Sequence, residues 1–146
     1  MNQIQQASRW SLLNGMHCGM PLDSPHRERQ GYGGDALTAA KACIYNFNME
    51  NFYAAWMDDF ADAQDEKTGF VPHTVPCQDG GGGPAWGCAY IIISWLCYQY
   101  YGDTEILKKH FGNMKHWMEF LATGVRNGIV EAEGEDENCL GERATP

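Results

Sequence analysis

The feature that most constrains the fold is a stretch near the middle of the chain, residues 86–101, that is apolar almost all round. A helix with apolar side chains on nearly every side is expected to be buried on most of its faces. Gly102 follows directly, and glycine is a common residue just past the end of a helix. The pattern therefore predicts a helix from Trp86 to Tyr101 that is packed among other elements.

Other stretches carry apolar residues at helical spacing. An opening helix is expected over residues 2–16, and two further helices over 35–45 and 49–63, with Asp35 as the N-cap of the first of these two. Another helix is expected after Asp103 or Thr104 and up to Gly124. Its buried side is predicted to comprise Ile106, Leu107, Phe111, Met114, Trp117, Met118 and Leu121, and the core is also expected to hold Trp56 and Trp95.

These elements predict one all-α domain in the 146 residues, made of consecutive helical hairpins joined by short turns and long Gly- and Pro-rich loops. Such hairpins side by side suggest an α/α toroid, although two of them cannot close a ring. The expected segments are an opening helix and polar loop (1–34), a first hairpin (35–65), a Gly/Pro loop (66–85), a second hairpin (86–124) and an acidic loop or tail (125–146).

Composition narrows the range of partners. The net charge of −9 argues against nucleic acid and anionic membranes, because both need a basic patch, and it fits a neutral substrate such as a sugar. The longest apolar run, residues 89–97, is too short to cross a membrane. The chain starts without a basic stretch followed by an apolar one, and its six cysteines are scattered without a CxxC pair, which indicates reduced thiols and a cytoplasmic protein.

Charged side chains are most concentrated in residues 23–35, which hold three carboxylates, Asp23, Glu28 and Asp35, and two guanidinium groups among Pro and Gly. Such a segment forms neither a helix stripe nor a core strand, so it predicts an active-site loop that holds acids and cations near one another. Acids close to Arg suit metal binding or acid/base catalysis on a polyol. The neighbouring aromatic residues favour the second.

Each of these residues also has a structural interpretation. Glu28 could be a carboxylate paired with an Arg, Asp23 could form a turn, and Asp35 could act only as a helix cap or do both jobs. Trp86 could be a core residue or a platform for a sugar ring.

Two other kinds of site are disfavoured. The glycine run at 80–83 is not followed by Lys-Ser/Thr and has no strand before it, so it is a poor phosphate loop. The pairs His17-Cys18 and His73/Cys77 lack the paired spacing of a zinc site.

With these residues in view, the chain resembles the catalytic domain of bacterial α-L-rhamnosidases, glycoside hydrolase family 78, which is a six-hairpin α/α toroid. The matching segments are residues 23–35, the Phe-Tyr-x-x-Trp-x-x-Asp core within 46–64, Gly-Gly-Gly-Gly-Pro-Ala-Trp-Gly at 80–87, and Tyr-Gln-Tyr-Tyr-Gly-Asp at 98–103. The resemblance covers nearly the whole chain and implies about the first half of the ring.

The resemblance implies inverting hydrolysis of terminal α-L-rhamnosides, without a cofactor. Glu28 matches the general acid, and Asp23, Arg27 and Asp35 match positions that contact the sugar hydroxyls. Tyr32 and Trp86 match positions that line the apolar face of the sugar pocket.

The chain also departs from the family pattern. The family's general base lies in later hairpins, beyond Pro146, and the carboxylates within 131–137 fall in the wrong segment for it. Tyr32 and Arg143 stand where tryptophans are usual.

Three functions therefore compete: an α-L-rhamnosidase-like fragment, an inactive or sugar-binding remnant, and a related toroid glycosidase with another sugar specificity. A partial ring would also leave apolar helix faces exposed, which predicts self-association.

Overall fold

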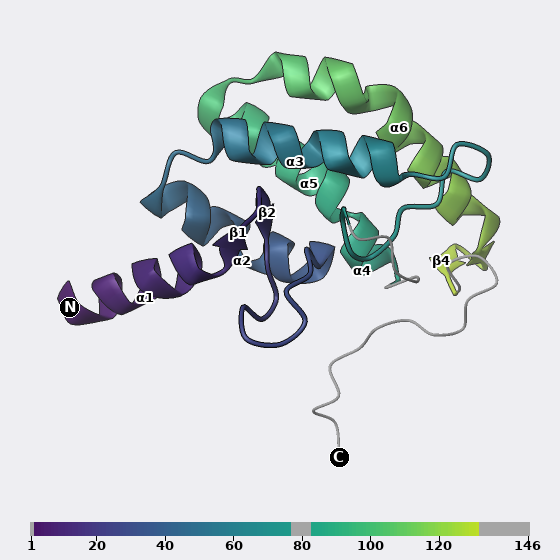
Figure 1. Ribbon diagram of the computed structural model, residues 1–146. Helices are drawn as coiled ribbons and strands as arrows, with labels where there is room; N and C mark the ends of the chain where they lie inside the picture. The colour runs from purple at the N-terminus through teal and green to yellow at the C-terminus, as the bar shows by residue number, and fades with distance from the viewer. Residues whose placement is uncertain (1, 77–82, 132–146) are drawn as a thin grey trace.

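The computed structural model describes residues 2–76 and 83–131 (Figure 1). The described residues form, in order, α1 (Asn2–Asn14), β1 (Met16–His17), β2 (Met20–Pro21), α2 (Gly33–Asn46), α3 (Glu50–Ala63), α4 (Pro84–Gly87), α5 (Ala89–Tyr101), α6 (Thr104–Thr123), β3 (Val125–Arg126) and β4 (Ile129–Val130). No helix in these two ranges is long and apolar enough to cross a membrane.

The long helices after α1 alternate in direction along the chain, and α5 lies at their centre. Figure 1 shows α2 and α5 running one way and α3 and α6 running the other way. The helix α5 contacts α2, α3 and α6, and α3 also contacts α6. This arrangement explains why the stretch that forms α5 is so apolar, since helices cover it from three directions.

Most of the predicted helix ends are confirmed. Gly102 ends α5 in the left-handed conformation, with φ of 73°. Asp103 caps α6, because its Oδ1 accepts hydrogen bonds from the backbone N–H groups of Glu105 and Ile106 at 3.0 and 3.1 Å. The expected helix over 86–101 starts two residues earlier and is divided at Cys88 into α4 and α5.

The predicted N-cap at Asp35 is wrong. The helix α2 begins at Gly33, with Tyr32 in the capping position, so Asp35 lies within the first turn. The two glycines that precede Asp35 are themselves helical, and α4 packs so closely against them that a Cβ at Gly33 would lie 2.3 Å from the Trp86 carbonyl oxygen. A carboxylate in the first turn still interacts favourably with the helix dipole.

The core is built on fully buried aromatic side chains, and some predicted core residues lie outside it. Trp56 and Trp117 are buried as expected. Trp95 is 48% exposed, and Phe111 and Met118, predicted on the buried side of α6, are 68% and 51% exposed. The side of α6 that faces the core carries Ile106, His110, Met114, Trp117 and Leu121, so Phe111 and Met118 lie just beyond its edge.

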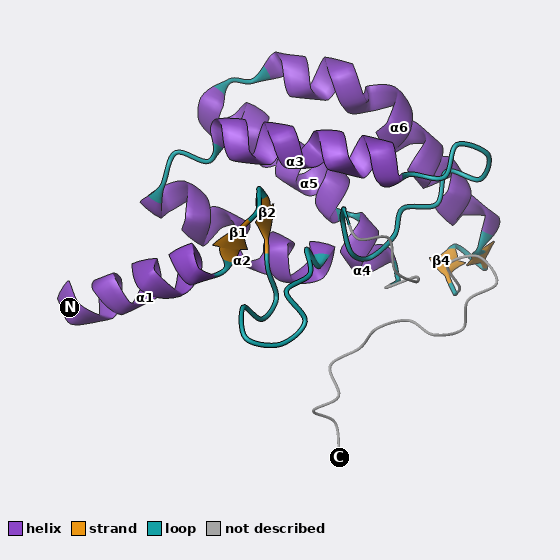
Figure 2. Cartoon of the chain, in the orientation of Figure 1, coloured by secondary structure: helices purple, strands orange, loops and turns teal. Residues whose placement is uncertain are grey.

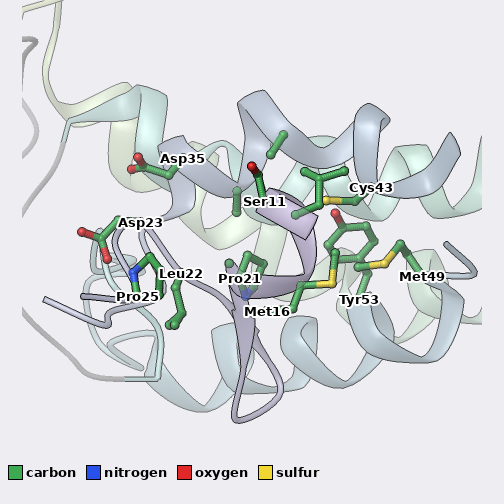
Figure 3. Close-up of a pocket in the computed structure, with 14 residues that line it drawn as sticks. Ser11, Met16, Pro21, Leu22, Asp23, Pro25, Asp35, Cys43, Met49 and Tyr53 are labelled. Carbon is green, nitrogen blue, oxygen red and sulfur yellow. The ribbon is translucent and has the colours of Figure 1, made fainter. Parts of the chain in front are cut away.

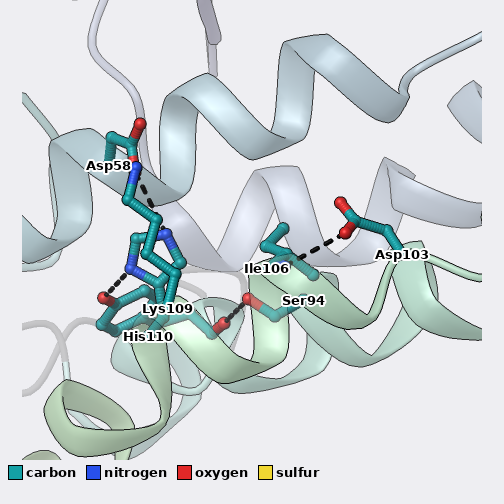
Figure 4. A network of polar contacts seen from close by, with 7 residues as sticks. Asp58, Ser94, Asp103, Ile106, Lys109 and His110 are labelled. Atoms are coloured by element: carbon teal, nitrogen blue, oxygen red, sulfur yellow. Dashed lines mark hydrogen bonds and ion pairs between the residues drawn. The ribbon is translucent and has the colours of Figure 1, made fainter.

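A polar network that is buried at Tyr90 and His110 and reaches the surface at Asp58 joins α3, α5 and α6 (Figure 4). The Tyr90 hydroxyl and His110 Nδ1 are 2.8 Å apart, and His110 Nε2 lies 3.1 Å from Asp58 Oδ1. Burial lowers the pKa of His110, so its imidazole is neutral near pH 7. A neutral ring can accept at Nδ1 from the Tyr90 hydroxyl, while its Nε2 lies beside the Asp58 carboxylate, which the Lys109 ammonium also contacts.

Two short hairpins were not predicted from the sequence (Figure 2). β1 pairs with β2 through a turn at Cys18 and Gly19, and β3 pairs with β4 through a turn at Asn127 and Gly128. All four turn residues have positive φ. The second hairpin occupies the start of the predicted acidic tail, and residues 132–146, including Arg143, lie outside the described residues.

Candidate active site

Residues 23–32 form a loop between β2 and α2 that folds back on itself. The backbone N–H of Asp23 donates to the Gln30 carbonyl, and the Gln30 N–H donates to Asp23 Oδ1, both at 3.2 Å. At the tip, the Ser24 carbonyl accepts from the N–H groups of Arg27 and Arg29 at 3.3 and 3.2 Å. This closed loop holds Asp23 at its base and presents Arg27 and Glu28 to solvent.

The base of the loop is attached to residues 73–75, which follow α3 by about ten positions along the chain. The Val75 N–H donates to the Gly31 carbonyl and the Gly33 N–H donates to the His73 carbonyl, each at 3.0 Å. Gly31 is required by this approach, since a Cβ there would lie 2.1 Å from the Val75 carbonyl oxygen. The loop is therefore positioned by a segment that is distant in sequence.

Glu28 and Asp23 form an interacting pair of carboxyl groups. The pKa of Glu28 is raised above its usual value, first because of a side-chain hydrogen bond with Asp23 and then because of the Asp23 charge. Asp35 raises it further, whereas the Arg27 guanidinium lowers it. A carboxyl group that keeps its proton to higher pH than a free Glu is suited to act as a general acid.

Tyr32 directly precedes α2, and Trp86, which belongs to α4, packs on the first turn of α2. The Tyr32 ring stacks on the His73 imidazole, with ring centroids 5.4 Å apart and planes inclined by 26°. The Trp86 indole packs on Gly34, where a Cβ would lie 2.8 Å from Trp86 Cε2. The Trp86 Nε1 atom is buried and has no hydrogen-bond partner within the ranges that the structure describes.

A cavity of about 190 Å³ lies beneath the loop, between α1, the β1–β2 hairpin and α2 (Figure 3). Asp23 and Asp35 line one end of it, and apolar groups such as Met16, Leu22 and Met49 line the rest. Figure 3 shows the two carboxylates gathered at the same end. The other four predicted site residues do not line this cavity.

The structure thus brings the predicted acids together and places the aromatic residues next to the helix that carries Asp35. His73 and its neighbours 74–75 were missed, and only the unusual length of the loop over residues 64–83 pointed to them. No group of three or more His, Cys, Asp or Glu side chains within residues 2–76 and 83–131 is arranged to hold a metal ion.

Comparison with known proteins gives a consistent result. Residues 1–140 match the model of the bacterial α-L-rhamnosidase six-hairpin glycosidase domain. An α-L-rhamnosidase from Formosa agariphila is 30% identical over 94% of this chain, and one from an Alteromonas species is 31% identical over 88%. The chain spans 16% and 14% of the lengths of these two relatives.

Solved structures agree with the sequence comparison. The α-L-rhamnosidase from Dictyoglumus thermophilum superposes with a TM-score of 0.82 at 38% identity, covering 88% of this chain and 15% of that protein. The Streptomyces avermitilis α-L-rhamnosidase, solved in complex with L-rhamnose, gives 0.80 at 27% identity over 86% of this chain and 12% of that protein. The predicted fold class, a partial α/α toroid of the six-hairpin glycosidase type, is confirmed.

Proposed function

The chain belongs to the bacterial α-L-rhamnosidase family of six-hairpin glycosidases, and we propose that it carries the general-acid side of a site that hydrolyses terminal α-L-rhamnosides. The observation that carries the proposal is the Asp23–Glu28 pair, in which a neighbouring carboxyl group raises the pKa of Glu28. A rise in pKa is the direction of shift that favours a proton donor.

In the proposed reaction Glu28 donates its proton to the glycosidic oxygen while the bond between that oxygen and the sugar C1 breaks. A water molecule attacks C1 from the opposite face and gives up a proton to a second carboxylate, so the configuration at C1 is inverted. In inverting enzymes the two carboxyl groups are roughly 6.5–9.5 Å apart, which leaves room for the water. We expect this base in a later hairpin, beyond Pro146.

The other predicted residues are assigned to substrate binding. Asp23, Arg27 and Asp35 are proposed to contact the hydroxyl groups of the rhamnose, since they surround Glu28 and act on its pKa. Tyr32 and Trp86 are proposed to line the apolar face of the sugar. A rhamnose-containing glycoside or oligosaccharide is then the partner of this site, and no cofactor takes part in the proposed steps.

The test is hydrolysis of a chromogenic α-L-rhamnoside by the purified chain and by Glu28→Gln. The variant keeps the size of the side chain but cannot donate the proton, so turnover should fall by about 10²- to 10⁴-fold. Glu66→Gln, an equivalent change at an exposed residue in the turn after α3, is the matched control and should retain parental turnover. Where the parent hydrolyses the substrate, an equal rate for Glu28→Gln would exclude Glu28 as the acid.

Two alternatives give different results in the same assay. A sugar-binding remnant would bind L-rhamnose saturably without turnover, and the small share of the relatives' length that the chain spans favours testing for it. A toroid glycosidase of another specificity would hydrolyse a different chromogenic glycoside from a panel. The cytoplasmic location stays a prediction from the cysteine pattern.

A further inference from the structure

Of the two proposed sugar-lining residues, Tyr32 is the one whose ring stacks on a neighbouring ring, the imidazole of His73. Its ring is half-buried, and the imidazole of His73 covers part of it at a centroid distance of 5.4 Å. His73 itself is only 8% exposed. The buried His73 imidazole therefore lies against the Tyr32 ring, which is still partly exposed.

The backbone around this pair leaves little freedom to either residue. Tyr32 and Thr74 form an antiparallel bridge, and the Gly33 N–H donates to the His73 carbonyl at 3.0 Å. The Trp56 indole N–H donates to the Val75 carbonyl at 3.1 Å, which ties the segment to α3. The backbone around His73 is thus hydrogen-bonded to Trp56 in the core on one side and to residues 32–33, at the end of the loop 23–32, on the other.

From this arrangement we propose that His73 is a positioning residue for sugar binding, which sets the plane of the Tyr32 ring so that its exposed part meets the apolar face of the sugar. A stacked partner restricts the orientation of an aromatic ring and adds to its packing energy. The inference rests on the proposed function, because it gives Tyr32 the role of a sugar-lining residue.

The experiment measures the affinity of the chain for L-rhamnose by titration calorimetry in the parent and in His73→Ala, His73→Phe and Tyr32→Ala. Losing a stacked ring should weaken binding by about 2- to 10-fold in His73→Ala, whereas His73→Phe, which keeps a ring, should stay within about twofold of the parent. Tyr32→Ala should weaken binding at least as much as His73→Ala, because it removes the lining ring itself.

Phe70→Ala is the matched control for general loss of packing. Phe70 lies three residues before His73 and packs edge-on against Phe120 at a centroid distance of 5.6 Å, without belonging to the site loop. It should lower the thermal midpoint while leaving the affinity for L-rhamnose unchanged. His73→Ala should change the affinity as well as the midpoint.

The outcomes separate the two proposals. If the parent binds L-rhamnose and His73→Ala binds it equally well, the role of His73 is overturned and the proposed function stands. Equal weakening by His73→Phe and His73→Ala would also overturn it, because the ring would then not be the cause. A parent that neither binds L-rhamnose nor hydrolyses rhamnosides would overturn the proposed function, and the role of His73 with it.

Discussion

Adding one methyl group at Gly87 should destabilise the protein, and adding one at Gly112 should stabilise it. Gly87 is the last residue of α4, and a Cβ there would lie 2.6 Å from Trp117 Cζ2 and 2.7 Å from Trp117 Cε2. Non-bonded carbon atoms prefer about 3.5–4.0 Å, so one of the two must move by roughly 1 Å. Trp117 is 1% exposed, so its ring cannot move out into solvent to relieve the contact.

The magnitude follows from two opposing terms. Overpacking a well-filled core costs about 1–3 kcal/mol, and replacing Gly by Ala returns about 0.5–1 kcal/mol of conformational entropy. Because the close contacts are all to the buried Trp117 ring, we take the upper part of the overpacking range, about 2–3 kcal/mol, so Gly87→Ala should lose about 1–2.5 kcal/mol in the free energy of unfolding. Gly112 lies inside α6, and nothing is within 4 Å of its added Cβ, so Gly112→Ala should gain about 0.5–1 kcal/mol.

Thermal unfolding followed by circular dichroism tests both variants together. At about 2–4 °C per kcal/mol for a chain of this size, the midpoint should fall by roughly 2–10 °C in Gly87→Ala and rise by roughly 1–4 °C in Gly112→Ala. A midpoint for Gly87→Ala equal to or above the parent would refute the close packing of α4 on Trp117. A fall in Gly112→Ala would refute the open environment assigned to that position.

Two further predictions concern the loop and the surface. Asp23→Asn removes the neighbour that raises the pKa of Glu28, so that pKa should fall and the alkaline limb of kcat/KM for a chromogenic rhamnoside should move to lower pH, since the acid must be protonated to act; an unmoved limb would contradict the pairing. The exposed apolar side chains of α1, α5 and α6, which include Trp10, Trp95 and Phe111, should cause concentration-dependent self-association measurable by light scattering, and a monodisperse monomer at all concentrations would count against it.

The ends of most helices could be predicted because their signals are local. Gly102 and Asp103 act through their own backbone and side-chain chemistry, so neighbouring residues suffice to identify them. Asp35 has an equally good local signal and was nevertheless wrong. The first turn of α2 includes Gly33 and Gly34, on which α4 packs, and this contact joins segments about fifty residues apart that a local signal does not report.

The sequence predicted that one side of α6 is buried, but not how far around the helix that buried side extends. Helical spacing correctly placed Met114 and Trp117 in the core, but it also included Phe111 and Met118, which lie at the edge of the same stripe. Whether such an edge is covered depends on where the neighbouring helix ends, and periodicity carries no information about that. The hairpin at residues 125–130 is different, because Asn127-Gly128 is a strong turn signal that the acidic character of the segment concealed.

The acidic residues of the site could be identified from the sequence, whereas the backbone segments that hold them in position could not. Asp23, Glu28 and Asp35 are conspicuous because charged residues among Pro and Gly have few structural uses. Their positions depend on the backbone bonds from residues 31–33 to residues 73–75, where the sequence shows only ordinary loop residues.

That second segment is in turn held by the core, which gives an exposed loop a rigid base. Gln64 Nε2 donates to the Gly69 and Asn113 carbonyls at 2.9 and 3.0 Å, and Asn113 Nδ2 donates back to Gln64 Oε1 at 2.8 Å. These bonds fix the start of the long loop to α6, and the bond from Trp56 fixes Val75 to α3. The proposed acid, Glu28, must stay solvent-exposed to meet its substrate, so burial cannot fix its position. Its position depends instead on the buried residues that hold the neighbouring backbone.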